Sequence, residues 1–408
     1  MPRRRARRSE RGRIIARGFD YHRAVAGRWA ALAVIFLTRV SMGVQFQSVA
    51  AAGPVMVDDL GLSWARLGTL LGLYMLPGAA FALLGAVIGQ RVGERRAVVG
   101  GLALMLGGGL VTALAGGFAV AAAGRLVSGS GAILLNILLA RMVADWFTGK
   151  EMATAMAVML TSWPVGLGLA AATLGDVAVA AGWRAATLVA AGTAAVGLVL
   201  MAAVYRDAPA RGAPAPGAAL AGRDLGLALA GGAAWGVFNA SLVVVVAFGP
   251  AMLLARGLSL GEAGGVVSLA LWVTILSVPL GGLLADRLRR PDLLIVLGSA
   301  AAALIMALLP ALPAPVIAFC LVGLVIGPPP GPLMALLPGA LAPDRLTSGL
   351  GVFYATFYVV MAVAQPAAGL VRDLTGATAA PMAFAAVVMA LTLVGLLAFR
   401  LVERASAR

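Results

Sequence analysis

An arginine lies inside the first long apolar segment of the chain, in the stretch FLTRVSMGVQFQ at residues 36–47. Arg39 follows Arg28, the last charge before the segment, by eleven residues. At a rise of 1.5 Å per residue this places Arg39 about 16 Å into a helix, close to the middle of a membrane. A guanidinium at that depth costs roughly 2.5–3.5 kcal/mol on insertion scales, so it is expected to face protein or water and to have a partner.

No acidic side chain is expected to reach Arg39, because all 16 Asp and Glu residues lie in tails, loops or the ends of apolar segments. Two interpretations therefore stay open. In the first, main-chain carbonyls, Gln47 and water satisfy Arg39, which only tethers helices. In the second, the partner is an anionic substrate. The second gains support from Arg125, which also lies in an apolar segment, although nearer its end, where it can extend to the membrane surface.

Further polar residues fall on single helical faces, as a shared binding site requires. Arg125 and Asn136 are nearly aligned at 100° per residue, and small residues between them let a ligand or a helix approach. Gln47 lies at the edge of the face that carries Arg39. Helix packing is the alternative explanation for the aromatic residues of such faces. In the second part of the chain, helical spacing groups Trp235 with Asn239, and Tyr354 and Tyr358 with Gln365.

Apolar segments dominate the chain, whose 408 residues are 62% hydrophobic and 12% charged, with a mean hydropathy of +1.00. Segments of roughly 20 residues recur, each long enough to cross about 30 Å of hydrocarbon, so we predict an all-α integral membrane protein. The predicted membrane spans are 29–52, 64–88, 97–117, 121–142, 152–174, 185–205, 226–253, 264–285, 292–311, 315–339, 348–371 and 379–401.

The longest hydrophilic interval, residues 206–224, is rich in Ala, Pro and Gly and is predicted to be a flexible cytoplasmic linker. It separates an N-terminal six-helix bundle at 29–205 from a C-terminal six-helix bundle at 225–402. Residues 1–28 and 403–408 are predicted to be basic cytoplasmic tails, because Lys and Arg gather in the tails and in alternate loops. We therefore expect a multi-pass protein of a cell membrane, the bacterial inner membrane, with both termini in the cytoplasm.

The composition also argues against several classes of function. The net charge of +15 follows from the basic tails and loops, so no nucleic-acid partner is expected. The chain has one cysteine, Cys320, and one histidine, His22, so we expect no disulfide framework, no metal site and no cofactor. A polytopic membrane enzyme is a remote alternative, since no catalytic cluster lies at membrane depth. The expected partners are a small-molecule substrate and the lipid bilayer; a monomer is compatible with the sequence, which leaves the oligomeric state open.

An internal repeat divides the spans six and six. Corresponding residues fall at the end of a first span, at the start of a second, or in the turn after it. Six spans repeated in one orientation give two bundles related by an axis along the membrane normal, with a substrate site expected between them. At an offset of 196 residues, Gly53-Pro54 coincides with Gly249-Pro250, Leu62-Ser63 with Leu258-Ser259, Gly68 with Gly264, Gly85 with Gly281 and Arg91 with Arg287.

Three motifs carry a family resemblance. The loop AVIGQRVGER at 86–95 and the loop GLLADRLRR at 282–290 both resemble the pattern G-x-x-x-D-R-x-G-R-[RK], and RLVSGSG at 125–131 fits R-x-x-x-G-x-G. On these motifs the chain resembles transporters of the major facilitator superfamily over essentially its whole length after the N-terminal tail. Within the superfamily, the arginine of the first span and the motif of the fourth are most similar to cyanate- and nitroimidazole-type porters.

The resemblance implies a fold of 12 transmembrane helices in two six-helix bundles that rock about a central site and expose it alternately. We therefore expect secondary transport of a small solute, an organic or inorganic anion, and no enzymatic activity. A multidrug exporter of the same superfamily is the alternative. The resemblance also implies that the two loops hold the interface between the bundles, although Gln90 replaces the aspartate of the family pattern. The gating residues expected in these loops are Gln90, Arg91, Arg95, Asp286, Arg287 and Arg290.

Prolines are predicted to interrupt two further spans. The tenth contains GPPPGP at 327–332, whose Pro329 and Pro330 remove backbone donors and must break or kink a helix. Irregular backbone at membrane depth is tolerated where it is buried or lines water, so we expect a gate or a cavity lining here; a packing kink is the alternative. Ser162-Trp163-Pro164 in the fifth span is expected to act in a similar way.

Overall fold

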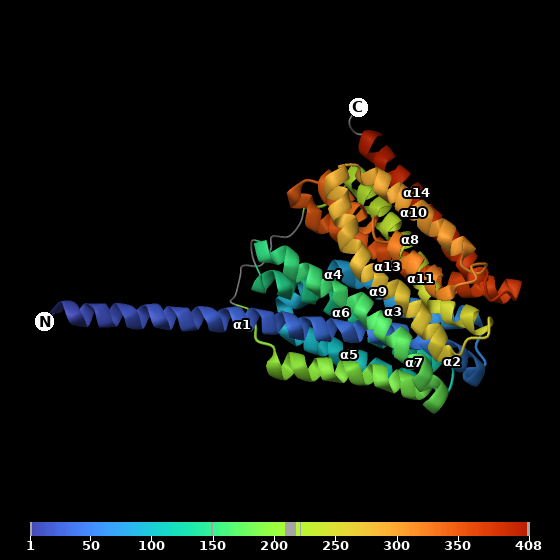
Figure 1. Ribbon diagram of the computed structural model, residues 1–408, viewed down its shortest axis with the longest axis horizontal. Coiled ribbons are helices and arrows are strands. Elements are labelled where there is room, and N and C mark those ends of the chain that lie inside the picture. Colours follow the sequence, from blue (N-terminus) through green and yellow to red (C-terminus); the bar gives the residue numbers. More distant parts are fainter. Residues whose placement is uncertain (1, 148–149, 209–217, 221, 406–408) are drawn as a thin grey trace.

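The computed structural model describes residues 2–147, 150–208, 218–220 and 222–405, with side chains from residue 27 onward except at 86, 150 and 153. These residues form helices joined by short turns (Figure 1). The first half of the chain contains α1 (Pro2–Ala51), α2 (Gly53–Leu60), α3 (Trp64–Met75), α4 (Gly78–Val92), α5 (Glu94–Ala113), α6 (Phe118–Trp146), α7 (Lys150–Val199) and the π-helix η1 (Leu200–Val204).

The second half repeats this arrangement after the linker. Its first helix begins at Arg223, and residues 209–217 and 221 of the predicted linker lie outside the described residues. The second half contains α8 (Arg223–Leu254), α9 (Leu260–Leu288), α10 (Pro291–Leu308), α11 (Pro315–Val325), α12 (Pro330–Ala340), α13 (Pro343–Thr375) and α14 (Ala380–Ala405).

Eleven helical stretches of the described chain are long and apolar enough to cross a membrane. One of them, Thr154–Val204, has 51 residues. At 1.5 Å per residue it is more than twice as long as a bilayer core, so it must cross twice. Its backbone leaves helical geometry at Gly182, with φ 84° and ψ 159°, a conformation that glycine adopts easily. Counting this stretch as two spans gives twelve and confirms the predicted fold class.

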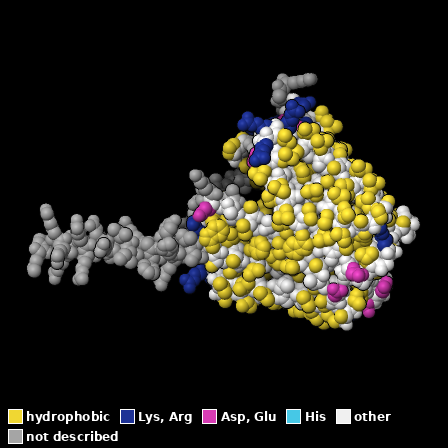
Figure 2. Space-filling model, viewed as in Figure 1, with side chains coloured by type: hydrophobic (Ala, Val, Ile, Leu, Met, Phe, Trp, Pro, Cys, Tyr) yellow, Lys and Arg dark blue, Asp and Glu magenta, His cyan; other side chains and the backbone are white. Residues whose placement is uncertain are grey.

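The two halves form separate bundles whose contact is tightest at one end. In the first half α1 packs along α7 and α5 along α6, whereas in the second α8 packs against α13 and α14. The helices of the two bundles converge at the right of Figure 1 and spread apart toward the chain termini. Hydrophobic side chains cover the middle of the visible face, with basic side chains at the top and left and acidic ones at the lower right, as expected for a surface in contact with lipid (Figure 2).

The prolines of the tenth span break it as predicted, because α11 ends at Val325 and α12 begins at Pro330. The break packs within the second half, where Gly327 lies against the carbonyl of Ser277 and Pro329 against Gly298. A hydroxyl from α9 supplies a hydrogen bond near the break, since Ser277 Oγ donates to the carbonyl of Gly323 at 2.6 Å. These contacts satisfy irregular backbone inside the bundle.

Candidate functional site

Arg39 on α1 is held by two other helices of the first half. Its Nε donates to Oδ1 of Asn136 on α6 at 3.0 Å. Its Nη1 donates to main-chain oxygens of Met159 and Leu160 on α7, at 3.1 and 3.2 Å, and to the Ser162 hydroxyl at 3.2 Å. The side chain is buried, with 7% of its surface exposed. The guanidinium therefore points into protein rather than into lipid.

The sequence of α7 explains why carbonyls are available to Arg39. Pro164 lies inside the helix and has no backbone N–H. It therefore cannot donate to the carbonyl four residues earlier, that of Leu160. Arg39 supplies the missing donor. The interruption predicted at Ser162-Trp163-Pro164 is wrong, because α7 continues as a helix through Pro164 and leaves helical geometry only at Gly182 among its described residues; the missing N–H alone frees an acceptor for the buried charge.

One edge of the Arg39 guanidinium stays open. Nη2 makes no hydrogen bond within the described part of the chain and is not among its fully enclosed polar atoms, so it contributes to the 7% of the residue's surface that stays exposed. No ion pair joins Arg39 to a carboxylate of the described residues. Arg39 thus keeps its full charge and has free donors on one edge.

Arg125 on α6 differs in each of these respects. Its Nε donates to the carbonyl of Leu70 at 3.0 Å, Nη1 to that of Gln45 at 2.8 Å and Nη2 to that of Phe46 at 3.3 Å. The guanidinium also lies 4.4 Å from the ring centre of Tyr74, and 1% of the residue is exposed. All three nitrogens are used to join α6 to α1 and α3, so Arg125 tethers helices in this conformation, and its predicted substrate contact stays a prediction.

A hydrogen bond at the same depth connects the two halves. Asn136, which accepts from Arg39, donates through Nδ2 to the hydroxyl of Tyr358 on α13 at 2.9 Å. A side chain at position 78 would overlap the ring of Tyr358, so Gly78 on α4 is what admits this ring to the first half. Tyr354, one turn earlier on α13, lies edge-on to Phe357 at 6.2 Å between ring centres. The structure thus brings together three predicted site residues, Arg39, Asn136 and Tyr358.

The aromatic residues of the second half form a cluster next to Tyr358. Phe357 contacts the Tyr358 ring edge-on at 4.9 Å between centres and stacks on Trp235 at 6.4 Å. Asn239 Nδ2 donates within its own helix to the carbonyl of Trp235. A hollow of about 320 Å³ lies farther out between α8, α13 and α14, but its lining is entirely apolar and offers nothing to an anion.

The two predicted glutamines lie where the halves touch. Gln47 on α1 is fully buried and donates to the carbonyl of Val246 on α8 at 3.5 Å, while its Oε1 has no partner within the described chain. Gln365 on α13 is also fully buried, and neither of its amide atoms has a partner among the described residues. Gly68 on α3 packs directly on the main chain of Gln365. Both side chains are therefore enclosed by the contact between the halves.

Contact between the halves is tightest at the end that carries Asp59, Asp176 and Asp373, here called the acidic end. A side chain at Gly72 would overlap the carbonyl of Ala362, and one at Gly264 would overlap that of Ala171. The first pair joins α3 to α13 and the second joins α9 to α7. Backbones approach this closely only through glycine. These contacts close the acidic end in both symmetry-related places.

Asp373 on α13 adds a polar contact that sequence reasoning missed. Its carboxylate accepts from the backbone N–H groups of Trp64 at 2.9 Å and Ala65 at 2.8 Å, the first two residues of α3. It thereby satisfies free donors at a helix N-terminus in the opposite half. Arg372 stacks on the Trp64 ring at 3.3 Å. The signal available in the sequence was a carboxylate at the end of the eleventh span, within PAAGLVRDLTG at 366–376.

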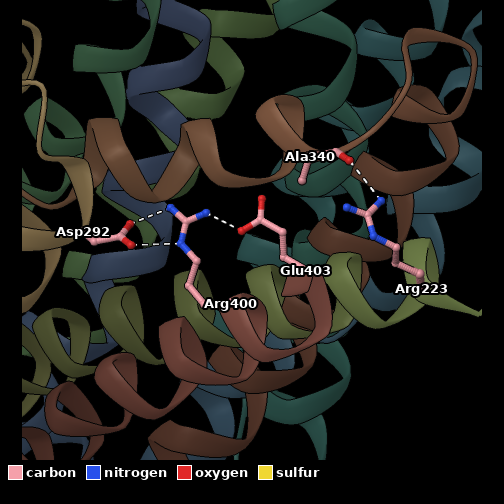
Figure 3. A network of polar contacts seen from close by, with 5 residues as sticks. All are labelled: Arg223, Asp292, Ala340, Arg400 and Glu403. Atoms are coloured by element: carbon pink, nitrogen blue, oxygen red, sulfur yellow. Dashed lines mark hydrogen bonds and ion pairs between the residues drawn. The ribbon is translucent and has the colours of Figure 1, made fainter. Parts of the chain in front are cut away.

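The opposite end, here called the basic end, carries Arg95 and Arg400 and is joined differently. Its ion pairs stay within one half: Arg95 with Asp207 in the first, and Arg400 with Asp292 and Glu403 in the second (Figure 3). Toward this end α4 still touches α13, where Gly351 faces Leu83. The other predicted gating residues of the two loops are exposed and make no hydrogen bond or ion pair across the halves among the described contacts; they are Gln90, Arg91, Asp286, Arg287 and Arg290.

Removing the Asp373 carboxylate is expected to loosen the acidic end. Loss of a helix-capping side chain costs about 0.5–2 kcal/mol, so Asp373→Ala should raise the population with this end open by about 2- to 30-fold. A cysteine at Phe248, which is fully buried against Trp64, reports opening through its rate of reaction with a membrane-impermeant maleimide in a Cys320→Ser background.

Asp59 provides the matched control for this measurement. It lies at the same end, but its hydrogen bonds come from Trp183 and Arg184 in its own half, and they lower the pKa of the Asp59 carboxyl. Asp59→Ala should therefore leave the reaction rate at Phe248→Cys unchanged. An equal rate in Asp373→Ala would show that the capping contact does not hold the halves together.

Comparison with known proteins agrees with this architecture. Residues 35–256 match the sequence profile of the Major Facilitator Superfamily, which is more than half of the chain. A solved bacterial homolog of the human lysosomal transporter Spinster, in an inward-facing and occupied conformation, superimposes with a TM-score of 0.73 at 15% identity, covering 93% of this chain and 97% of that one. The chain belongs to the major facilitator superfamily and is a multi-pass membrane transporter.

A curated relative matches only part of the chain. The hexuronate transporter of Bacillus subtilis (strain 168) is 23% identical over 150 residues, which are 37% of this chain. The chain spans 36% of the length of that relative in the match. Its substrate is therefore a property of that protein, and the substrate of this chain has to be argued from the site.

Proposed function

We propose that the protein is a secondary transporter of a small anion, organic or inorganic, and that the anion binds to the free edge of Arg39. One observation supports this most strongly: Arg39 is buried near mid-membrane with its Nη2 unbonded and no carboxylate of the described chain paired to it. An anion that enters the open edge neutralises the charge and completes its hydrogen bonds. The hexuronate specificity of the distant relative is consistent with an organic acid.

The proposed mechanism is alternating access. The two bundles rock about the level of Arg39, so that the acidic end and the basic end open in turn. The contacts of Gly72, Gly264 and Asp373 belong to the state with the acidic end closed. The basic tails and loops favour a bacterial inner membrane with both termini in the cytoplasm, which makes the present state the inward-facing one.

Counterflow in proteoliposomes tests the proposal. Vesicles are loaded with unlabelled D-glucuronate, benzoate, formate or nitrate and diluted into a trace of the same labelled anion. A transient accumulation that requires the protein supports anion transport. Accumulation of a cationic dye without counterflow of any anion would instead favour the multidrug exporter, and chemical conversion of the added compound would favour an enzyme. The first result is expected.

A further inference from the structure

The hydrogen bonds from Arg39 to Tyr358 run in one direction only. A guanidinium has donors and no acceptor, so the atom of Asn136 that faces Arg39 Nε must be the carbonyl oxygen Oδ1. The amide group of Asn136 therefore presents Nδ2 to Tyr358, and this nitrogen can only donate. The Tyr358 oxygen consequently accepts. Arg39 thus determines, through Asn136, that Tyr358 in the other half of the protein is the acceptor of this hydrogen bond.

The hydroxyl group of Tyr358 is left as an unsatisfied hydrogen-bond donor among the described residues. Its oxygen accepts from Asn136, and the proton makes no hydrogen bond to any acceptor in the described chain. The residue is 3% exposed, and its ring is held between Gly78 and Phe357. A buried hydroxyl proton without an acceptor is unfavourable, because the bond it made in water has been lost. The free donor needs an acceptor that the described chain does not supply.

We propose that the Tyr358 hydroxyl donates a hydrogen bond to the same anion that binds Arg39, and that the substrate is an oxyanion of the carboxylate type. This inference rests on the proposed function. Arg39 Nη2 belongs to the first half and Tyr358 Oη to the second, and a single Asn136 amide group lies between their side chains. The two oxygens of one carboxylate match two donors that approach from different helices. A halide is a single atom and can accept from both donors only where they converge on one point, so it matches two separated donors less well than a carboxylate does.

A carboxylate that accepts from both Arg39 and Tyr358 also holds the two halves together while the substrate is bound. Without an anion, the polar contact that the described residues make across the halves at this depth is one neutral hydrogen bond between Asn136 and Tyr358. With a carboxylate present, each half adds a donor to the same charged group, and such charge-assisted bonds are roughly twice as strong as neutral ones. Binding therefore favours the occluded arrangement.

Tyr358→Phe tests the inference, because it keeps the ring packed against Gly78 and removes only the hydroxyl. The affinity of purified protein for formate and for bromide is measured by thermal shift at matched ionic strength. Loss of one hydrogen bond to a charged group should weaken formate binding about 10- to 100-fold. Bromide binding, which depends mainly on the charge of Arg39, should weaken less than formate binding. A purely structural role would shift the melting temperature without changing the preference for formate.

Tyr205→Phe is the matched control, since this hydroxyl accepts from Trp146 Nε1 at 3.0 Å within the first half. It should leave both affinities unchanged. If Tyr358→Phe does not fold, 3-fluorotyrosine at position 358 keeps the ring and strengthens the donor, and it should tighten formate binding.

Three outcomes separate the inference from the function on which it rests. Weakened formate binding in Tyr358→Phe supports both. If Arg39→Gln abolishes formate binding but Tyr358→Phe, or the fluorinated residue, leaves it unchanged, the Tyr358 inference is wrong and the Arg39 site stands. If the unmodified protein binds no carboxylate at all, the proposed function fails, and the inference fails with it.

Discussion

Arg39→Gln is expected to abolish anion counterflow, with a loss of apparent affinity of about 100-fold or more. The charge-assisted hydrogen bond from Nη2, worth roughly 1.5–3 kcal/mol, is lost together with the positive charge that attracts the anion. Arg39→Lys should be intermediate, since an ammonium keeps the charge but not the planar fork that contacts Asn136, α7 and the substrate together. Initial rates against anion concentration, at equal amounts of protein in the vesicles, measure both effects.

Arg125→Gln is the control that separates binding from tethering. Arg125 is a buried arginine of the same half, but its three nitrogens are all bonded to main-chain carbonyls. Its replacement leaves carbonyls of Gln45, Phe46 and Leu70 without these donors, so the melting temperature should fall while the affinity of the surviving protein for the anion is retained. If Arg39→Gln behaves in the same way as Arg125→Gln, Arg39 is a tether and the anion site is refuted.

The sequence allowed the depth and isolation of Arg39 to be predicted because both follow from counting along a helix. The rise per residue gives the depth, and the positions of the 16 acidic residues exclude a carboxylate partner. Its actual partners could not be predicted. They depend on how α1, α6 and α7 are rotated against each other, and two of them are main-chain oxygens, which every residue has.

The different fates of Arg39 and Arg125 also depend on how the helices are rotated. Both are arginines in apolar spans, and their sequence contexts predicted similar roles. Arg125 reaches three carbonyls because Gly129, one turn away, lets α6 approach the main chain of Tyr74 on α3. Small residues on a helix face predicted a close approach, but not whether a helix or a ligand makes it. The structure shows a helix.

Contacts between the halves were the least predictable part of the site. The repeat placed Gly68 and Gly264 at equivalent positions, and the structure uses both at the acidic end. The family motifs drew attention to the loops of the basic end, where Arg91 and Asp286 make no contact across the halves among the described hydrogen bonds and ion pairs. A sequence carries the contacts of every state of a transporter, and one conformation displays only part of them. Asp373 was missed because its partners are backbone N–H groups, which no residue type identifies.

Asn136→Asp is expected to eliminate anion transport while preserving or raising stability. Aspartate has the shape of asparagine, so one oxygen can still accept from Arg39 Nε, and the charge of the guanidinium is now balanced within the protein. The other oxygen faces Tyr358 and can only accept, so the tyrosine must turn its proton toward position 136. The Tyr358 donor proposed for the substrate is then engaged by the introduced carboxylate, which also balances the charge of Arg39 through Nε and leaves Nη2 unbonded.

The size of this effect distinguishes the anion site from a structural network. An ion pair at a separation of about 4 Å is worth roughly 4 kcal/mol at an effective dielectric constant of 20, so an anion that competes with the introduced carboxylate should lose about 100-fold or more in affinity. Asn136→Leu serves as the comparison, because it removes the hydrogen bonds of Asn136 with Arg39 and Tyr358 without adding charge. This variant should retain part of the anion affinity. Counterflow and melting temperature are measured on all three proteins. If Arg39 is only a tether between helices, the new carboxylate strengthens it and leaves transport unaffected. A wild-type rate of transport by Asn136→Asp would therefore show that Arg39 does not bind the substrate.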